Sequence, residues 1–62
     1  MRKLKDLIND NLDVSLSKFA EAIGVSRPTI YNIINDTMKH KPSAYIVKRI
    51  CKYFNVDYKE YL

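Results

Sequence analysis

The fold is decided by residues 19–34, which read Phe19-Ala20-Glu21-Ala22-Ile23-Gly24-Val25-Ser26-Arg27-Pro28-Thr29-Ile30-Tyr31-Asn32-Ile33-Ile34. Apolar residues recur at helical spacing before the only glycine of the chain, and Gly24 is suited to the left-handed conformation that ends a helix. A second helix is predicted to follow, because Ser26 is a good N-cap and Pro28 is tolerated in a first turn. The stretch therefore predicts two short helices with a tight turn between them.

Only three residues join these two predicted helices. So short a connection sets two helices at a steep angle, as in a helix-turn-helix, which we predict at approximately residues 15–35. Ala20 is small at the point where the helices are expected to cross. Ile30 and Ile33 are spaced to pack back against the first helix at Phe19. The inward-facing residues therefore all fit the same steep crossing of the two predicted helices.

The rest of the chain keeps the helical spacing of apolar residues, and no segment shows the persistent alternation typical of a strand. Serine or aspartate N-caps and glycine or asparagine C-caps mark most boundaries. The expected helices run from about Arg2 to Asn11, from Ser15 to Gly24, from Ser26 to about Asn35, from Ser43 to Asn55, and from Asp57 through Leu62. We therefore expect an all-α fold, a compact five-helix unit in which residues 1–62 form a single helix-turn-helix domain.

The size and composition of the chain limit its function. Its 62 residues allow one small domain, in which no deep catalytic cavity is expected. The single cysteine, Cys51, excludes an internal disulfide and fits a reducing cytosol. No apolar run is long enough to cross a membrane, and no signal peptide is expected behind Arg2 and Lys3. Eleven basic against seven acidic residues favour a polyanionic partner such as nucleic acid.

The chain resembles the phage-repressor-like helix-turn-helix domains, also called the Cro/repressor or xenobiotic-response-element type. The resemblance runs from Leu4 through Phe19-Ala20, Gly24-Val25-Ser26, Ile30 and Ile33 to Lys41-Pro42-Ser43 and the segment from Ile46 to Leu62. It implies a lambda-repressor-like fold and a sequence-specific, DNA-binding transcriptional regulator of phage or bacterial origin. The implied partner is a double-stranded DNA operator, bound by a homodimer in the cytoplasm, in the cytosol or nucleoid of a bacterial host.

The outward face of the third helix holds the residues expected to read DNA bases. Pro28, Tyr31, Asn32 and Asn35 follow one another at helical spacing opposite the isoleucines, and Arg27 stands at the helix start. An arginine can bind guanine O6 and N7, and an asparagine can bind adenine N6 and N7. The resemblance implies the same N-terminal positions. We expect base contacts from Arg27, Pro28, Tyr31 and Asn32; the alternative is a polar face that is only solvated.

Phosphate contacts are expected from hydroxyls, amides and cations around the same helix. The loop after it carries a basic run at residues 39–41, and Ser43 opens a helix whose N-terminus favours phosphate. The expected DNA-backbone contacts are Ser17, Lys18, Ser26, Thr29, Asn35, Lys39, His40, Lys41 and Ser43. Ordinary solvation of the basic loop is the alternative here.

Leu16 departs from the family, which usually has a glutamine at this position. It either extends the buried stripe or is an exposed apolar group suited to a protein partner. The same question applies to the five tyrosines of the chain, Tyr31, Tyr45, Tyr53, Tyr58 and Tyr61, because tyrosine is enriched at protein interfaces. Core packing with an exposed hydroxyl is the alternative, and Tyr31, Tyr58 and Tyr61 are the tyrosines expected at an interface. A second hypothesis is therefore a protein-binding modulator, an antirepressor or co-repressor that docks on another repressor protein. An antitoxin, which would also bind DNA, is a third.

Nothing in the sequence indicates an enzyme. No residue order suggests a catalytic triad. His40 has no cysteine or second histidine at ligand spacing, so we expect no metal, no cofactor and no small-molecule substrate. Cys51 lies on the expected buried stripe of the fourth helix and is predicted to be inert.

Overall fold

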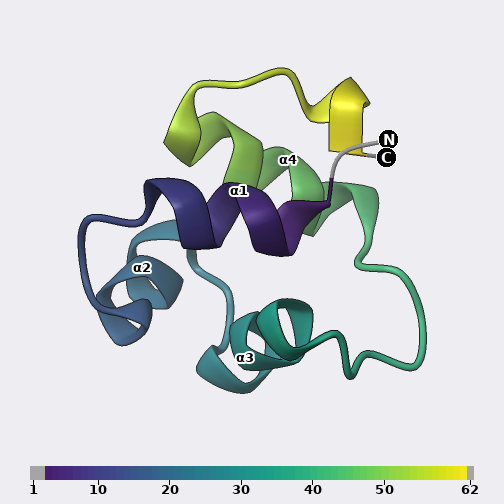
Figure 1. Ribbon diagram of the computed structural model, residues 1–62, viewed down its shortest axis with the longest axis horizontal. Helices are drawn as coiled ribbons and strands as arrows, with labels where there is room; N and C mark the ends of the chain where they lie inside the picture. Colours follow the sequence, from purple (N-terminus) through teal and green to yellow (C-terminus); the bar gives the residue numbers. More distant parts are fainter. Residues whose placement is uncertain (1–2, 62) are drawn as a thin grey trace.

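In the computed structural model, residues 3–61 are described, and they form four α-helices followed by a short 3-10 helix (Figure 1). The elements are α1 (Leu4–Asn11), α2 (Leu16–Ile23), α3 (Arg27–Asn35), α4 (Ala44–Phe54) and η1 (Tyr58–Tyr61). α3 packs against both α1 and α2, and η1 packs on α4. Arg2 and Leu62, expected in the first and last helices, lie outside the described residues. Among the helices of residues 3–61, none has the length and apolarity needed to cross a bilayer.

The prediction of an all-α fold with a helix-turn-helix is confirmed, but the prediction of five α-helices is wrong in its last element. Residues 58–61 form a single turn of 3-10 helix. Asp57 does start this turn, because its carboxylate accepts a hydrogen bond from the backbone N–H of Lys59 at 3.0 Å. A segment of only one turn is the length at which 3-10 geometry is common.

Serine residues occupy the N-caps of α2, α3 and α4. The Oγ atoms of Ser15 and Ser43 each accept a backbone N–H from the third residue of the following helix, at 3.2 and 3.3 Å. Ser26 stands at the N-cap of α3 as predicted, but its side chain makes no capping hydrogen bond. Pro28 has no N–H to offer, and the Ser26 hydroxyl pairs with the Thr29 hydroxyl at 2.7 Å instead.

The same three helices end at residues in the left-handed conformation. Gly24 ends α2 with a φ of +73°, as predicted. A Cβ at this position would lie 3.6 Å from the Arg49 guanidinium, so the backbone conformation, not a lack of space, favours glycine. Asn55 ends α4 at a φ of +59°, also as predicted. Asp36, predicted only as a loop residue, ends α3 in the same way.

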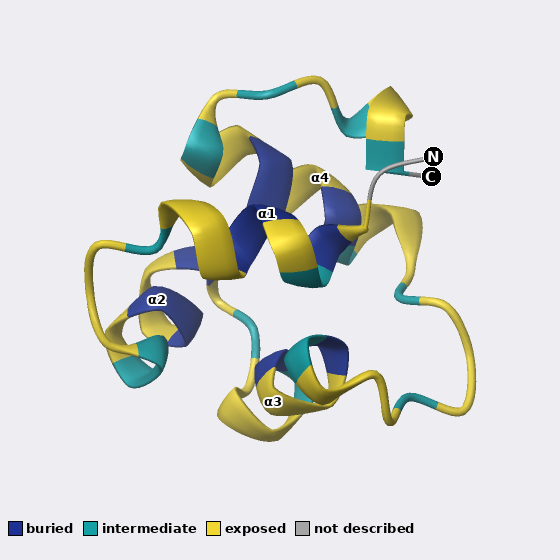
Figure 2. Cartoon of the chain, viewed as in Figure 1, coloured by how far each residue is buried: buried dark blue, intermediate teal, exposed yellow. Residues whose placement is uncertain are grey.

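The buried residues face inward from all four α-helices, whereas the outer faces are exposed (Figure 2). They are Leu4, Leu7, Ile8, Phe19, Ala20, Ile23, Ile30, Ile33, Val47, Ile50 and Cys51. The predicted inward positions of α2 and α3 therefore form the core, with Ile34 partly buried beside it. Ile46 and Phe54 of α4 are also partly buried against this cluster.

Phe19 is the central aromatic residue of this core and is fully buried. Its ring meets the Tyr53 ring edge-on, with 5.0 Å between centroids and an angle of 80°. The Phe54 ring lies on another side of it at 5.4 Å. Edge-to-face aromatic pairs add to the free energy gained from burial. These contacts join α2 to the end of α4 and so hold the helix-turn-helix on the rest of the domain.

The buried thiol of Cys51 makes folding sensitive to alkaline pH. Burial raises the pKa of Cys51, and the negative charges of Asp57 and Glu60 raise it further. The folded-state pKa thus lies above the unfolded-state value of about 8.5, so this contribution to stability is full below about pH 8.5 and is lost as pH rises through the folded-state pKa. Urea titrations across this range should show the free energy of unfolding falling more steeply for wild type than for Cys51→Ala. Parallel curves would contradict this prediction.

Candidate nucleic-acid interface

The outer face of α3 is polar and open to solvent (Figure 2). Its core-facing side carries the buried Ile30 and Ile33. The opposite side carries the predicted base readers and one predicted backbone contact, all exposed: Arg27, Pro28, Tyr31, Asn32 and Asn35. Tyr31 keeps 44% of its surface accessible. The structure therefore brings these five residues together on one helix face with no protein segment covering it within residues 3–61.

The first turns of α2 and α3 are linked by their side chains. Arg27 Nη1 donates a long hydrogen bond of 3.5 Å to Ser17 Oγ. The paired hydroxyls of Ser26 and Thr29 lie at the start of α3, and Lys18 is exposed in the first turn of α2. Because both helices begin here, their N-terminal dipoles and free N–H groups favour an anion at this surface.

Asn32 is oriented by a residue that sequence reasoning missed. Thr37 Oγ1 donates a hydrogen bond of 2.9 Å to Asn32 Oδ1, and the Thr37 backbone N–H donates to the Asn32 carbonyl at 3.0 Å. Both bonds depend on the left-handed turn at Asp36, which folds the chain back over the end of α3. The remaining lone pair of Oδ1 and the two amide N–H groups stay available to a ligand. The Thr37 hydroxyl thus fixes which way the amide group points.

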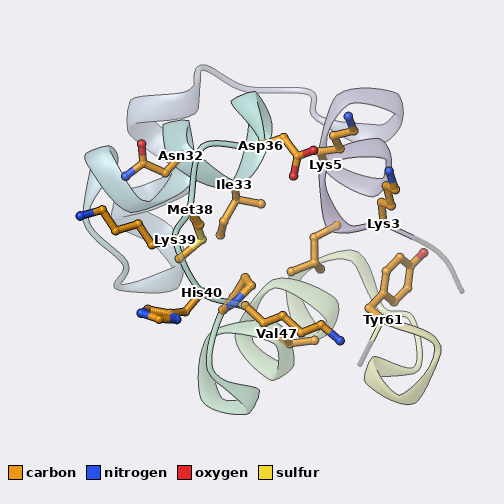
Figure 3. A pocket seen from close by; sticks show the side chains of 13 residues that line it. Lys3, Lys5, Asn32, Ile33, Asp36, Met38, Lys39, His40, Val47 and Tyr61 are labelled. Atoms are coloured by element: carbon orange, nitrogen blue, oxygen red, sulfur yellow. The ribbon is translucent and has the colours of Figure 1, made fainter.

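The basic loop lies beside this face. Lys39, His40 and Lys41 are exposed, and Ser43 caps the next helix. Figure 3 shows the side chains of Asn32 and Lys39 pointing toward the same side of the molecule, one from α3 and one from the loop. The predicted phosphate contacts of the loop therefore border the predicted base-reading face.

The residues predicted for a protein interface differ in exposure. Leu16 is partly buried against the core, as expected if it extends the buried stripe. Tyr58 is half-buried, with the Lys48 ammonium 4.9 Å from its ring centroid, and Tyr61 is also half-buried. Tyr31 is exposed. Two further tyrosines, both on α4, are also exposed.

These residues are Tyr45 and Tyr53, with 62% and 39% of their surfaces exposed. Arg49 lies between them in sequence, donates from Nε to the Tyr45 hydroxyl at 2.9 Å, and lies 5.0 Å from that ring centroid. Tyr45 and Arg49 are four residues apart, the spacing at which two side chains meet on one helix face. Within residues 3–61, no three histidine, cysteine, aspartate or glutamate side chains gather as a metal site would need.

Comparison with known proteins gives one match. The helix-turn-helix family model matches residues 4–61, which cover all four α-helices and η1. No curated protein and no solved structure matches the chain. The match extends well beyond the two helices of the motif itself, as the sequence resemblance does. The chain therefore belongs to the helix-turn-helix family of the Cro/repressor type, a family of phage-repressor-like DNA-binding domains.

Proposed function

We propose that this protein is a sequence-specific transcriptional regulator of the repressor type, which reads the major groove of an operator with α3. The observation that carries the proposal is the exposed outer face of α3, where Arg27 opens the helix and the Asn32 amide is held by Thr37. The major groove is wide enough to admit an α-helix and presents a distinct pattern for each base pair. A face of arginine, tyrosine and asparagine suits that pattern.

The proposed roles follow from side-chain chemistry. Arg27 pairs with guanine O6 and N7, and Asn32 pairs with adenine N6 and N7. Pro28 and Tyr31 supply contact surface beside these bases, with the Tyr31 hydroxyl available to a phosphate. The hydrogen bond from Arg27 to Ser17 gives the guanidinium a defined direction before DNA arrives. Pre-orientation lowers the entropic cost of binding.

Phosphate contacts are proposed to position α3 in the groove. Ser17, Lys18, Ser26 and Thr29 lie at the paired starts of α2 and α3, where the helix dipoles favour an anion. At the end of α3 and in the segment that follows it, the proposed contacts are Asn35, Lys39, His40, Lys41 and Ser43. Such contacts fix the orientation of the protein but carry no sequence information.

Neutralising one loop lysine tests the phosphate contacts. We expect Lys39→Gln to reduce the slope of log binding constant against log salt by about one, because one fewer counterion-releasing contact is made. Lys59→Gln, in η1, removes the same charge away from α3 and should leave the slope unchanged. Fluorescence anisotropy with a duplex at several salt concentrations measures both slopes. Equal slopes for wild type and Lys39→Gln would remove this lysine from the contact set.

The Thr37 hydroxyl is expected to contribute through Asn32. Thr37→Val keeps the side-chain shape but removes the donor, and we expect operator affinity to fall roughly two- to tenfold, the equivalent of about 0.5–1.5 kcal/mol. Thr37→Ser retains the hydroxyl and serves as the matched control. The comparison is made by titrating the same duplex with each variant. A Thr37→Val protein that binds like Thr37→Ser would show that the hydrogen bond does not matter for recognition.

We also propose that the protein acts as a homodimer in the bacterial cytosol or nucleoid. Two copies would place their α3 helices in successive major grooves about 34 Å apart, on two half-sites of one operator. The tyrosines considered for protein contacts are Tyr58 and Tyr61, half-buried in η1, and the exposed Tyr31. Sedimentation of the protein with a duplex would give two copies per operator, whereas one copy on a single half-site would exclude the dimer.

A second candidate function is a protein-binding modulator, an antirepressor or co-repressor. The observation that favours it is the exposure of Tyr31 on the face of α3, with Tyr45 and Tyr53 exposed elsewhere. An antitoxin is a third candidate, and it would share the DNA-binding surface. A toxin encoded beside the gene and bound by the protein would identify it.

The deciding experiment is selection of bound duplexes from a random DNA pool by the purified protein alone, followed by a gel shift on the enriched sequence. The repressor proposal expects a defined motif and a shift that survives excess unrelated DNA. No enrichment at low salt, together with co-purification of a repressor protein, would support the modulator and contradict direct DNA recognition.

A further inference from the structure

An open cavity of about 520 Å³ lies where the start of α1, the end of α3, the loop after α3, α4 and η1 meet (Figure 3). Its floor is apolar. Leu4, Ile33 and Val47 reach it from the core, and the half-buried Met38 lies over them from the loop. The volume falls within the range of about 300–1,000 Å³ typical of small-molecule sites. A domain of this size therefore keeps a hollow with an apolar base.

The cavity is surrounded by positive charge. Lys3 and Lys5 line it on the α1 side, and Lys39 and Lys41 line it on the loop side. The one acidic side chain in the lining described here is Asp36. Figure 3 shows Lys3 and Lys5 on one side of the opening and Lys39 on the other, with Ile33 and Met38 between them. Lysine stems add apolar surface to the walls while their ammonium groups stay in solvent at the rim.

We propose that this cavity binds a small amphipathic anion, a molecule with a compact apolar body and one carboxylate or sulfonate group. The apolar body covers the half-buried Met38 and the small exposed edges of Leu4 and Ile33, and the anionic group pairs with lysines at the rim. A fully polar anion such as free phosphate leaves that floor in contact with water. A neutral apolar molecule gains nothing from the lysines. The combination of floor and rim selects a molecule that has both parts.

The position of the cavity makes such a ligand an effector of DNA binding, an inference that rests on the proposed function. Asn32 and Lys39 line the cavity and also belong to the proposed DNA surface. An anion held at the rim offsets positive charge that would otherwise attract DNA phosphates. By linkage, the ligand and the duplex then weaken each other's binding by the same factor. The protein would release its operator when the anion accumulates.

Binding is tested with 8-anilinonaphthalene-1-sulfonate, an aromatic sulfonate, followed by two-dimensional NMR of the whole chain. We expect saturable one-to-one binding, with the largest shifts in the amide signals of Leu4, Ile33 and Met38. Uncharged N-phenyl-1-naphthylamine has the same aromatic body and should bind at least tenfold more weakly. The absence of saturable binding, shifts confined to other parts of the chain, or equal affinity for the two probes would overturn the proposal.

Charge reversal locates the anionic group. The double variant Lys3→Glu/Lys5→Glu should raise the dissociation constant of the sulfonate at least tenfold. It is expected to fold, because glutamate is favoured at the start of a helix such as α1. The control Lys52→Glu/Lys59→Glu makes the same change in net charge at two lysines that do not line the cavity, and it should alter the constant by less than threefold. Equal effects of the two double variants would contradict a site at these lysines.

Met38→Gln tests the apolar floor, because it replaces an apolar side chain there with a polar one. It should weaken binding of the sulfonate at least threefold.

The effector role has a separate readout. With the sulfonate at saturation, affinity for the selected duplex should fall at least threefold, and the fall should disappear in Lys3→Glu/Lys5→Glu. Unchanged duplex affinity would overturn the effector role. Whether the cavity binds the sulfonate would still be decided by the NMR titration alone. If the protein bound no duplex at all, the proposed function would fail, and the titration with the two probes would still decide whether the cavity binds amphipathic anions.

Discussion

Phe19→Ala is expected to leave most of the protein unfolded at room temperature. Phe19 is fully buried and contacts the rings of Tyr53 and Phe54, so the substitution removes a large apolar side chain and leaves a hole between α2 and α4. Replacing a buried phenylalanine by alanine typically costs about 3–5 kcal/mol. A single core in a domain of this size rarely supplies more than about 3–5 kcal/mol of stability. The loss is therefore comparable with the whole free energy of unfolding.

Thermal unfolding followed by circular dichroism measures this effect, and Val14→Ala is the matched control. Val14 lies in the connection before α2 with 38% of its surface exposed, so its truncation should change the free energy of unfolding by less than about 0.5 kcal/mol. A Phe19→Ala protein with a cooperative transition close to that of wild type would show that Phe19 is not the residue that joins α2 to α4.

Arg27→Ala is expected to weaken binding to the selected operator by about 1–3 kcal/mol, or roughly five- to 150-fold. The guanidinium is exposed at the first position of α3 and contacts only Ser17 among the hydrogen bonds seen, so the folded protein should tolerate its loss. The affinity for unrelated DNA should fall much less. There the variant loses only the attraction of one positive charge to the phosphates, because Arg27 makes no specific base contact on such a duplex. Titrations of both duplexes at one salt concentration measure the ratio of the two affinities.

Lys52→Ala removes one positive charge from the exposed side of α4 and serves as the control for net charge. It should weaken binding to both duplexes slightly and equally. If Arg27→Ala behaved in the same way, the guanidinium would act only as a charge, and the base-reading role would be lost. Asn32→Ala should resemble Arg27→Ala in reducing the preference for the operator.

Much of the fold follows from local signals in the sequence. Gly24 and Asn55 end helices because their residue types tolerate the left-handed conformation, and Ser15 and Ser43 start helices because their hydroxyls accept a free N–H. The expected capping hydrogen bond at Ser26 is absent because the Ser26 hydroxyl pairs with the Thr29 hydroxyl. That hydroxyl belongs to the third residue of α3, the same residue whose backbone N–H a capping serine would bind. Residues 58–61 carry helical spacing, but spacing does not distinguish one α-turn from one 3-10 turn.

The candidate site was less predictable from sequence. The exposed face of α3 follows from helical periodicity, so Arg27 and Asn32 were found. Thr37 was not, since its bond to Asn32 requires the left-handed turn at Asp36, and aspartate adopts that conformation only in certain contexts. The open cavity was also missed, because it is lined by residues from five separate segments. Only the tertiary arrangement brings the lysines of α1 next to the loop after α3.

The most direct test of the account is a double-mutant cycle between α3 and the major-groove edges of the bases. Each guanine of the selected operator is replaced in turn by 7-deazaguanine, which lacks only the N7 acceptor, and binding of wild type and Arg27→Ala is compared. If Arg27 reads a guanine, there is a position at which the replacement costs wild type about 1 kcal/mol or more of binding free energy and costs Arg27→Ala almost nothing. Asn32→Ala should show the same coupling with 7-deazaadenine. Costs that are equal for wild type and both variants at every position would contradict base reading by α3.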